Sequence, residues 1–157
     1  MKSLAMECRE YIAVGGEQTL RRTPYVRRLR MAEISLSEVE LYLQENMDPS
    51  FNELLFLMID RTGQRDSEVY KRARIDRRHF SKIRSNKKYI PSKKTVIALC
   101  LSLQLSREDA DTLLSAAGYS LSRSDEYDLA IAFCFSRRIF DFFEINEMLY
   151  ELGFEVF

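Results

Sequence analysis

Residues 66–94 constrain the fold more than any other stretch, because they predict two short helices separated by a tight turn. Asp66 and Asp76 each stand where a carboxylate oxygen can accept hydrogen bonds from the free amides at the start of a helix. The first helix is expected over residues 67–73 and the second over residues 77–85. The rest of the chain is expected to support this pair of helices.

The apolar residues of the segment follow helical spacing. Val69 and Ala73 are four residues apart, and Phe80 and Ile83 are three apart, so each pair falls on one face of its helix. Ile75, in the turn, is expected to fill the angle between the helices. The residues outside the buried stripe of the second helix are mostly basic: Arg77, Arg78, Lys82 and Arg84, with His79 beside them.

Positive charge is concentrated in the same part of the chain, although the chain as a whole has a formal net charge of zero. Residues 61–94 contain 13 Lys and Arg against three acidic residues, and both flanking parts have an excess of acids. A local basic surface on a neutral protein is typical of a protein that binds a polyanion such as nucleic acid. The alternative is an ordinary solvated helix face. We favour the polyanion because the basic run coincides with the predicted helix pair.

Residues 75–86 read Ile-Asp-Arg-Arg-His-Phe-Ser-Lys-Ile-Arg-Ser-Asn, and Lys87-Lys88 follow before Pro91-Ser92 begin another helix. Together with the preceding helix, this pattern resembles the helix-turn-helix of the Cro and phage-repressor (XRE-like) family, over residues 50–119. The resemblance implies a bundle in which the second helix of the pair enters the major groove of DNA. It also implies which residues contact base edges: Arg77, Arg78 and Lys82.

Two positions depart from the pattern of that family. The family usually has a small residue within the first helix of the pair and glycine in the turn, whereas this chain has Tyr70 and Arg74. Tyr70 is expected either to widen the angle between the helices or to lie outward. Arg74 is expected either to avoid a positive backbone angle or to adopt one under strain.

Further polar and basic residues follow the second helix and are expected to bind phosphates. Lys93 and Lys94 fall in the first turn of the next helix, where the helix dipole disfavours positive charge. A phosphate held at that helix start would explain their position. The predicted nucleic-acid-binding residues are Arg77, Arg78, His79, Lys82, Ser85, Asn86, Lys87, Lys88, Lys93 and Lys94.

Capping residues and apolar spacing predict the other helices. Four serines stand at capping positions: Ser35, Ser50, Ser92 and Ser106. The helix after Ser35 carries one apolar stripe, made by Leu36, Val39 and Leu43, whereas the helix after Ser92 is apolar nearly all round and should be the most buried. We therefore predict an all-α fold with a lambda-repressor-like five-helix bundle, including the helix-turn-helix, over residues 35–120.

A C-terminal extension, residues 121–157, is expected to add two helices, over residues 125–137 and 141–152. Seven of the ten phenylalanines lie between Phe133 and Phe157. Such apolar surface must be buried either on the bundle or against a partner, including a second copy of the chain, and both alternatives stay open. The residues expected to face inward are Leu129, Ala132 and Phe133 on the first helix, and Phe142, Ile145, Met148, Leu149 and Leu152 on the second.

Residues 1–34 are expected to form a basic N-terminal arm with five arginines around Pro24. Such an arm can lie along phosphates or enter a minor groove. A flexible or partner-docked tail fits the composition equally well.

The sequence lacks the usual marks of an enzyme, a metalloprotein or a membrane protein. His79 is the only histidine and stands beside no recognisable nucleophile motif, and the chain has no glycine-rich phosphate loop, no HExxH and no metal-spaced cysteines. Cys8, Cys100 and Cys134 are expected to be reduced residues of a cytoplasmic protein. No apolar stretch is long enough to span a bilayer, and no signal peptide is recognisable. We predict no cofactor and no catalytic activity.

The sequence thus predicts a helix-turn-helix protein that binds duplex DNA as a bacterial or phage transcriptional regulator, with a homodimer as one arrangement. The alternative is the same fold used as a protein-interaction or RNA-binding module, such as an inhibitor, antitoxin or adaptor. Tyr70 and Arg74, the arginine-rich second helix and the acidic, phenylalanine-rich C-terminal residues favour that alternative.

Overall fold

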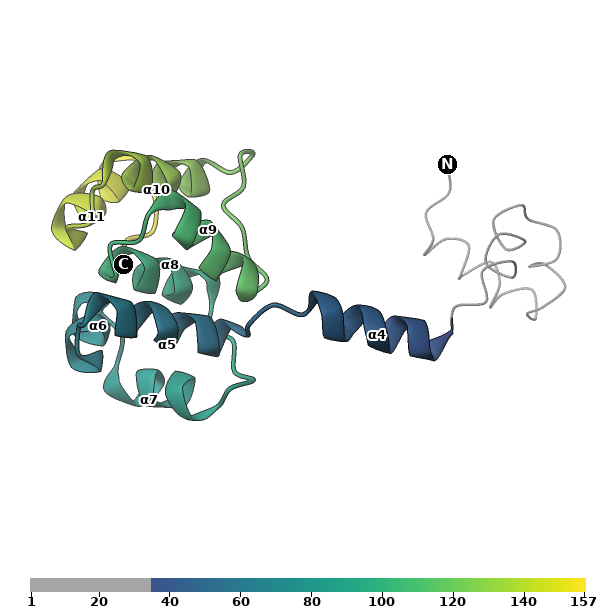
Figure 1. Cartoon of the computed structure of the whole chain (residues 1–157). Coiled ribbons are helices and arrows are strands. Elements are labelled where there is room, and N and C mark those ends of the chain that lie inside the picture. Colours follow the sequence, from purple (N-terminus) through teal and green to yellow (C-terminus); the bar gives the residue numbers. More distant parts are fainter. Residues whose placement is uncertain (1–34) are drawn as a thin grey trace, which may run out of the picture. The chain divides into compact units, whose positions relative to one another are not determined.

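The computed structural model describes residues 35–157, so the predicted basic arm and Cys8 lie outside the described residues. The chain divides into two compact units, residues 1–47 and residues 48–157. The first unit contributes α4 (Leu36–Asn46), and the second consists of seven helices, α5 to α11 (Figure 1). No strand is present in residues 35–157, which confirms the all-α prediction.

Helix α4 starts where its capping signal predicts, with Ser35 at the N-cap. The Glu38 carboxylate accepts a hydrogen bond from the Ser35 amide at 3.3 Å. Its apolar stripe is nevertheless exposed, with Leu36 at 81%, Val39 at 39% and Leu43 at 55%. The second compact unit begins at Asp48, so α4 is not one of the helices of the bundle.

Helix α5 (Phe51–Thr62) is the first helix of the bundle. The Ser50 hydroxyl accepts from the Glu53 amide at 3.2 Å, and the Glu53 carboxylate accepts from the Ser50 amide at 3.0 Å. This reciprocal pair satisfies two amides that a helix start would otherwise leave free. Gly63 ends the helix with a φ of 70°, a left-handed conformation that glycine adopts without strain.

Helix α6 (Asp66–Arg72) and helix α7 (Arg77–Ser85) are the predicted pair. For α7 the prediction is confirmed in full, because the Asp76 carboxylate accepts from the Arg78 amide at 3.1 Å. For α6 the predicted cap is wrong. Arg65 is the N-cap residue, its amide donates to the Glu68 carboxylate at 2.8 Å, and Asp66 is already helical.

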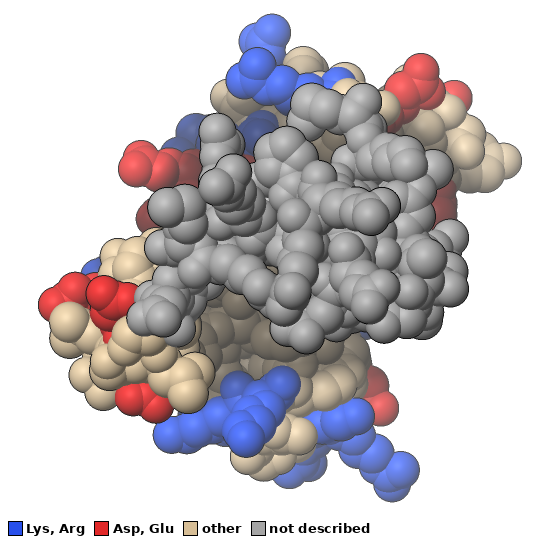
Figure 2. Space-filling view, turned by 90° about the vertical axis from the view of Figure 1, so that its right-hand side faces the viewer, with Lys and Arg blue, Asp and Glu red and all other residues tan. Residues whose placement is uncertain are grey.

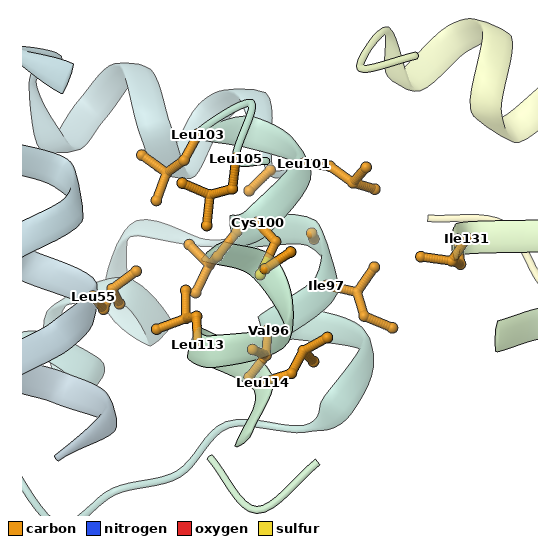
Figure 3. Close-up of a cluster of buried hydrophobic side chains, with 14 of the residues drawn as sticks. Leu55, Val96, Ile97, Cys100, Leu101, Leu103, Leu105, Leu113, Leu114 and Ile131 are labelled. Carbon is orange, nitrogen blue, oxygen red and sulfur yellow. The ribbon is translucent and has the colours of Figure 1, made fainter. Parts of the chain in front are cut away.

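Helix α8 (Lys93–Ser102) is the most buried helix, as predicted, and every residue from Val96 to Ser102 is buried. Helix α9 (Arg107–Ala116) packs beside it and buries Ala110, Leu113 and Leu114. In Figure 3, Leu55 of α5 lies on one side of α8 and Ile131 lies on the other. The core is therefore built around α8. Ser92 and Ser106 cap these two helices by accepting from the Thr95 amide at 3.3 Å and the Asp109 amide at 3.1 Å.

Helix α10 (Glu126–Arg137) and helix α11 (Phe142–Glu151) pack on the bundle and share its core. The predicted inward face of α10 is wrong, because Leu129 and Phe133 are each 47% exposed. Helix α10 is apolar on more than one side, and the side that is buried holds Ile131, Cys134 and Phe135. On α11 the prediction holds for Phe142, Ile145 and Leu149, Met148 is half-buried, and Leu152 is 56% exposed.

Cys100 and Cys134 are free, buried thiols, as predicted. Burial raises the pKa of both, that of Cys134 to about 11, because a thiolate loses its hydration there. Between residues 35 and 157, no helix combines the length and the apolar character needed to cross a membrane.

Candidate nucleic-acid interface

Helices α6 and α7 are held together by a small aromatic and aliphatic core. Val69 and Ile83 are fully buried and Phe80 is 3% exposed. The ring of Tyr70 lies 5.4 Å from that of Phe80, and Phe56 of α5 approaches the same ring edge-on at 6.0 Å. Tyr70 is half-buried and packs against the core, so of the two alternatives for this residue, the outward position is excluded.

The turn between these helices adopts the positive φ that the family's glycine would provide. Arg74 has a φ of 56°, and its amide donates to the Lys71 carbonyl at 3.1 Å. The Ile75 amide donates to the Tyr70 carbonyl at 2.8 Å. These two bonds form a Schellman motif, in which the residue after the left-handed one usually makes an apolar contact. Ile75 is half-buried against the core, which agrees with its predicted role in the angle.

The outward face of α7 presents the three predicted base-contacting residues. Arg77, Arg78 and Lys82 are all exposed. In the part of the chain that the structure describes, none of their charged groups forms an ion pair with a carboxylate. Their charges are therefore available to a ligand in solution.

The inward side of α7 is anchored by polar contacts that the sequence did not indicate. Asn52, a buried residue of α5, donates its side-chain amide to the Ile83 carbonyl. Arg84 pairs with Asp66 of α6 at 2.6 Å and lies 4.0 Å from the centroid of the Phe56 ring. Arg84 lies off the buried stripe, as expected, and its side chain is 49% exposed, but its charge is paired with Asp66, so we leave it out of the candidate site.

A tight turn after α7 holds two more lysines outward. The Asn86 side-chain oxygen accepts from the Lys88 amide at 3.1 Å, and the Tyr89 amide donates to the Asn86 carbonyl at 3.0 Å. Lys87 and Lys88 are exposed at this turn, and so is Ser85 before it. Asn86 thus shapes the turn in addition to being an exposed candidate for binding.

Tyr89 organises the side chains between α7 and this turn. Its hydroxyl is hydrogen-bonded to a ring nitrogen of His79 at 3.1 Å, and the Lys82 ammonium lies 4.2 Å from the centroid of its ring. His79 is half-buried by these contacts, so it positions neighbours more than it offers itself to a ligand. Sequence reasoning missed Tyr89, although an aromatic residue directly after a lysine pair was a usable signal.

Lys93 and Lys94 have partners inside the chain. The Lys93 ammonium lies 2.6 Å from the carboxylate of Asp128, which is 4% exposed and also accepts from the Ser122 amide at 2.8 Å. Lys94 pairs with Glu155 at 3.0 Å. Both lysines therefore attach the C-terminal extension to the start of α8, and we leave them out of the candidate site.

The remaining cations form what we call the basic face: Arg77, Arg78, Lys82, Lys87 and Lys88. In Figure 2, Lys and Arg gather at the lower edge of the molecule, the edge at which α7 lies in Figure 1. Phe80, Ile83 and Asn52 fix α7 from the inside, so the basic face is presented by a rigid helix and a hydrogen-bonded turn.

The basic face has none of the side chains needed for metal chemistry, and residues 35–157 contain no group of three or more His, Cys, Asp and Glu placed to hold a metal ion. Comparisons with known protein families, with curated proteins and with solved structures found no match for this chain. The function is therefore argued from the residues and their geometry.

Proposed function

We propose that this protein binds duplex DNA through the basic face, with α7 in the major groove. One observation carries the proposal. Helix α7 is anchored on one side by Phe80, Ile83 and Asn52 and presents on the other side exposed cations that have no carboxylate partner among residues 35–157. In helix-turn-helix proteins, the second helix of the pair packs on the bundle through one side and enters the major groove with the other. Helix α7, anchored on one side and cationic on the other, has the same arrangement.

Arg77 and Arg78 occupy the first turn of α7, and Lys82 lies little more than one turn further along the helix. In helix-turn-helix proteins the N-terminal residues of the recognition helix contact base edges. An arginine can donate two hydrogen bonds to O6 and N7 of one guanine, which discriminates against the wrong base by about 1–3 kcal/mol. We assign sequence reading to Arg77, Arg78 and Lys82, and a preference for guanine to the two arginines.

Ser85 is the last residue of α7, and Lys87 and Lys88 follow the helix directly. We assign all three to phosphates. A lysine is a point charge on a flexible stem, so it neutralises a phosphate without selecting a base. Each phosphate contact releases a condensed cation from DNA, and binding should therefore weaken steeply as the salt concentration rises. We propose that the biological role is transcriptional regulation in a bacterium or a phage.

The experiment is a titration of labelled duplex DNA by fluorescence anisotropy at several salt concentrations, with the full chain. Lys87→Ala should weaken binding to every duplex alike and reduce the slope of log K against log salt by about one unit. Arg123→Ala is the matched control, because Arg123 is an exposed arginine far along the chain, between α9 and α10. It should leave the slope unchanged.

Two results would contradict the proposal. The first is a slope that falls equally for Lys87→Ala and Arg123→Ala. The second is the absence of duplex binding near physiological salt together with a protein or RNA that binds the same face in a defined ratio. The second result would favour a protein-interaction or RNA-binding module.

A further inference from the structure

Helix α10 has a second apolar side that the bundle leaves uncovered. Ile131, Cys134 and Phe135 are buried, and Figure 3 shows Ile131 on the side of the cluster around α8. Leu129 and Phe133 lie on the other side of the helix and are each 47% exposed. They are four residues apart, so they lie one above the other and form a continuous apolar surface.

Charged residues of opposite sign stand at the two ends of this surface. Glu126 lies in the first turn of α10 and Arg137 in its last turn, both exposed and both on the side of Leu129 and Phe133 by helical periodicity. The Arg137 guanidinium lies 5.5 Å from the centroid of the Phe133 ring. Neither charge forms an ion pair with any residue from 35 to 157. We call these residues the outer strip of α10: Glu126, Leu129, Phe133 and Arg137.

The outer strip is complementary to a second copy of itself turned through a half rotation. When two α10 helices lie antiparallel around a two-fold axis at the middle of the helix, Leu129 of each copy lies beside Phe133 of the other. Glu126 of each copy then lies level with Arg137 of the other, because each of them is about 8 Å along the helix from that axis. Apolar groups thus meet at the centre and opposite charges meet at both ends.

We propose that two copies of this chain form a dimer through the outer strip, with their α10 helices antiparallel. Charge favours a second copy as the occupant. An acidic partner would meet Glu126 and a basic partner would meet Arg137, whereas the same strip in the reverse direction satisfies both ends. The two-fold symmetry repeats each contact and closes the assembly. A contact made by one helix from each copy is small, so the dimer is expected to be weak.

The dimer holds the two basic faces at its far ends. In Figure 1, α7 lies at the lower edge of the bundle and α10 at the upper edge, with α8 between them. The basic face points away from the bundle because Phe80 and Ile83 of α7 face the core, and the outer strip points away from it on the opposite side. Two copies joined at α10 therefore present their basic faces in opposite directions. If the basic face binds DNA, which rests on the proposed function, one dimer holds two separate duplexes rather than two half-sites of one duplex.

The first test is sedimentation equilibrium of the full chain over a range of concentrations without DNA, so its outcome does not depend on the proposed function. The wild type should dimerise, and Leu129→Ser should raise the dissociation constant by about tenfold or more. Leu57→Ser is the matched control, because Leu57 is a leucine of α5 with the same exposed fraction, 47%. It should leave the constant unchanged. A wild type that stays monomeric, or equal constants for the two leucine variants, would overturn the proposal.

The second test exchanges the charges. Glu126→Arg and Arg137→Glu should each weaken the dimer, because each variant places like charges level with one another at both ends. A mixture of the two variants should dimerise again, because the two arginines of one chain then meet the two glutamates of the other. Arg61→Glu is the control, since Arg61 is an exposed arginine in the last turn of α5, and it should dimerise like the wild type. Circular dichroism checks that each variant is folded. A mixture that stays monomeric would rule out the antiparallel arrangement.

The third test concerns the direction of the basic faces. The full chain is added to an immobilised duplex and then to a second, labelled duplex. The wild type should retain the labelled duplex, whereas Arg137→Glu should bind either duplex alone but retain far less of the second. A dimer that binds duplex DNA and never retains a second duplex would overturn the opposite placement of the basic faces. A chain that binds no duplex would overturn the proposed function and DNA bridging, and the dimer measured without DNA would stand.

Discussion

At the residue scale, Arg74, Gln104 and Arg138 adopt a backbone conformation that glycine usually provides. Their φ angles are 56°, 53° and 56°, and each follows the last turn of a helix. For a residue with a side chain this conformation costs about 1–2 kcal/mol. The hydrogen bonds from the Arg74 and Ile75 amides hold it in place at the turn of the helix pair. The turn of the candidate site is thus built without glycine, at a cost in stability.

Arg74→Gly should therefore stabilise the fold by about 0.5–1 kcal/mol, because glycine removes the strain and loses part of the gain to its greater freedom in the unfolded chain. Urea unfolding followed by circular dichroism measures this change. Arg74→Ala is the control, because alanine keeps the strain and should give no such gain. Equal stability of the two variants would show that backbone strain at residue 74 is negligible.

A substitution at Lys93 should change the stability of the fold without changing DNA binding. Lys93→Met leaves the buried Asp128 carboxylate without its cation and should destabilise the fold by about 2 kcal/mol, less than for a fully buried pair because Lys93 is 34% exposed. DNA affinity and its salt slope should not change. A loss of one unit of salt slope, as expected for Lys87→Ala, would return Lys93 to the DNA interface.

At the scale of elements, helix starts were predictable because a cap is a local interaction. Ser50, Asp76 and Ser92 each accept a hydrogen bond from an amide two or three residues later, so the sequence contains both partners. Partners far apart in the sequence gave no such signal. The pairing of Lys93 with Asp128, 35 residues later, depends on how α10 packs, and so does the exposure of Phe133. The sequence of α10 is apolar on more than one side of the helix, so it does not indicate which side is buried.

The capping box of α5 predicts a pH dependence of stability. Hydrogen bonds from the amide and then the hydroxyl of Ser50 lower the pKa of the Glu53 carboxyl below its ordinary value of 4.5. A lowered pKa in the folded state gives stability that is present above pH 4.5 and is lost as the pH falls through the folded value. The urea midpoint of the wild type should therefore fall more than that of Glu53→Gln as the pH is lowered from 6 to 3. Parallel curves would show that the bonds seen at Ser50 contribute nothing.

At the scale of the whole molecule, residues 48–157 form a bundle around α8 that presents the basic face through α7. The sequence indicated that five cations are exposed, because helical periodicity places three of them off the buried stripe of α7 and the other two follow that helix in a turn: Arg77, Arg78, Lys82, Lys87 and Lys88. It did not indicate the residues that make this face rigid. Asn52 lies 31 residues before Ile83, and only the folded chain brings them together.

The measurement that tests the central claim most directly is selection of binding sites from random duplex DNA by the wild type, Arg77→Ala and Lys87→Ala. If α7 reads base edges, the wild type enriches a motif containing guanine, and Arg77→Ala loses the preference at one position of that motif. Lys87→Ala should enrich the same motif with weaker binding throughout. No enriched motif for the wild type, or an identical motif for Arg77→Ala, would contradict the account.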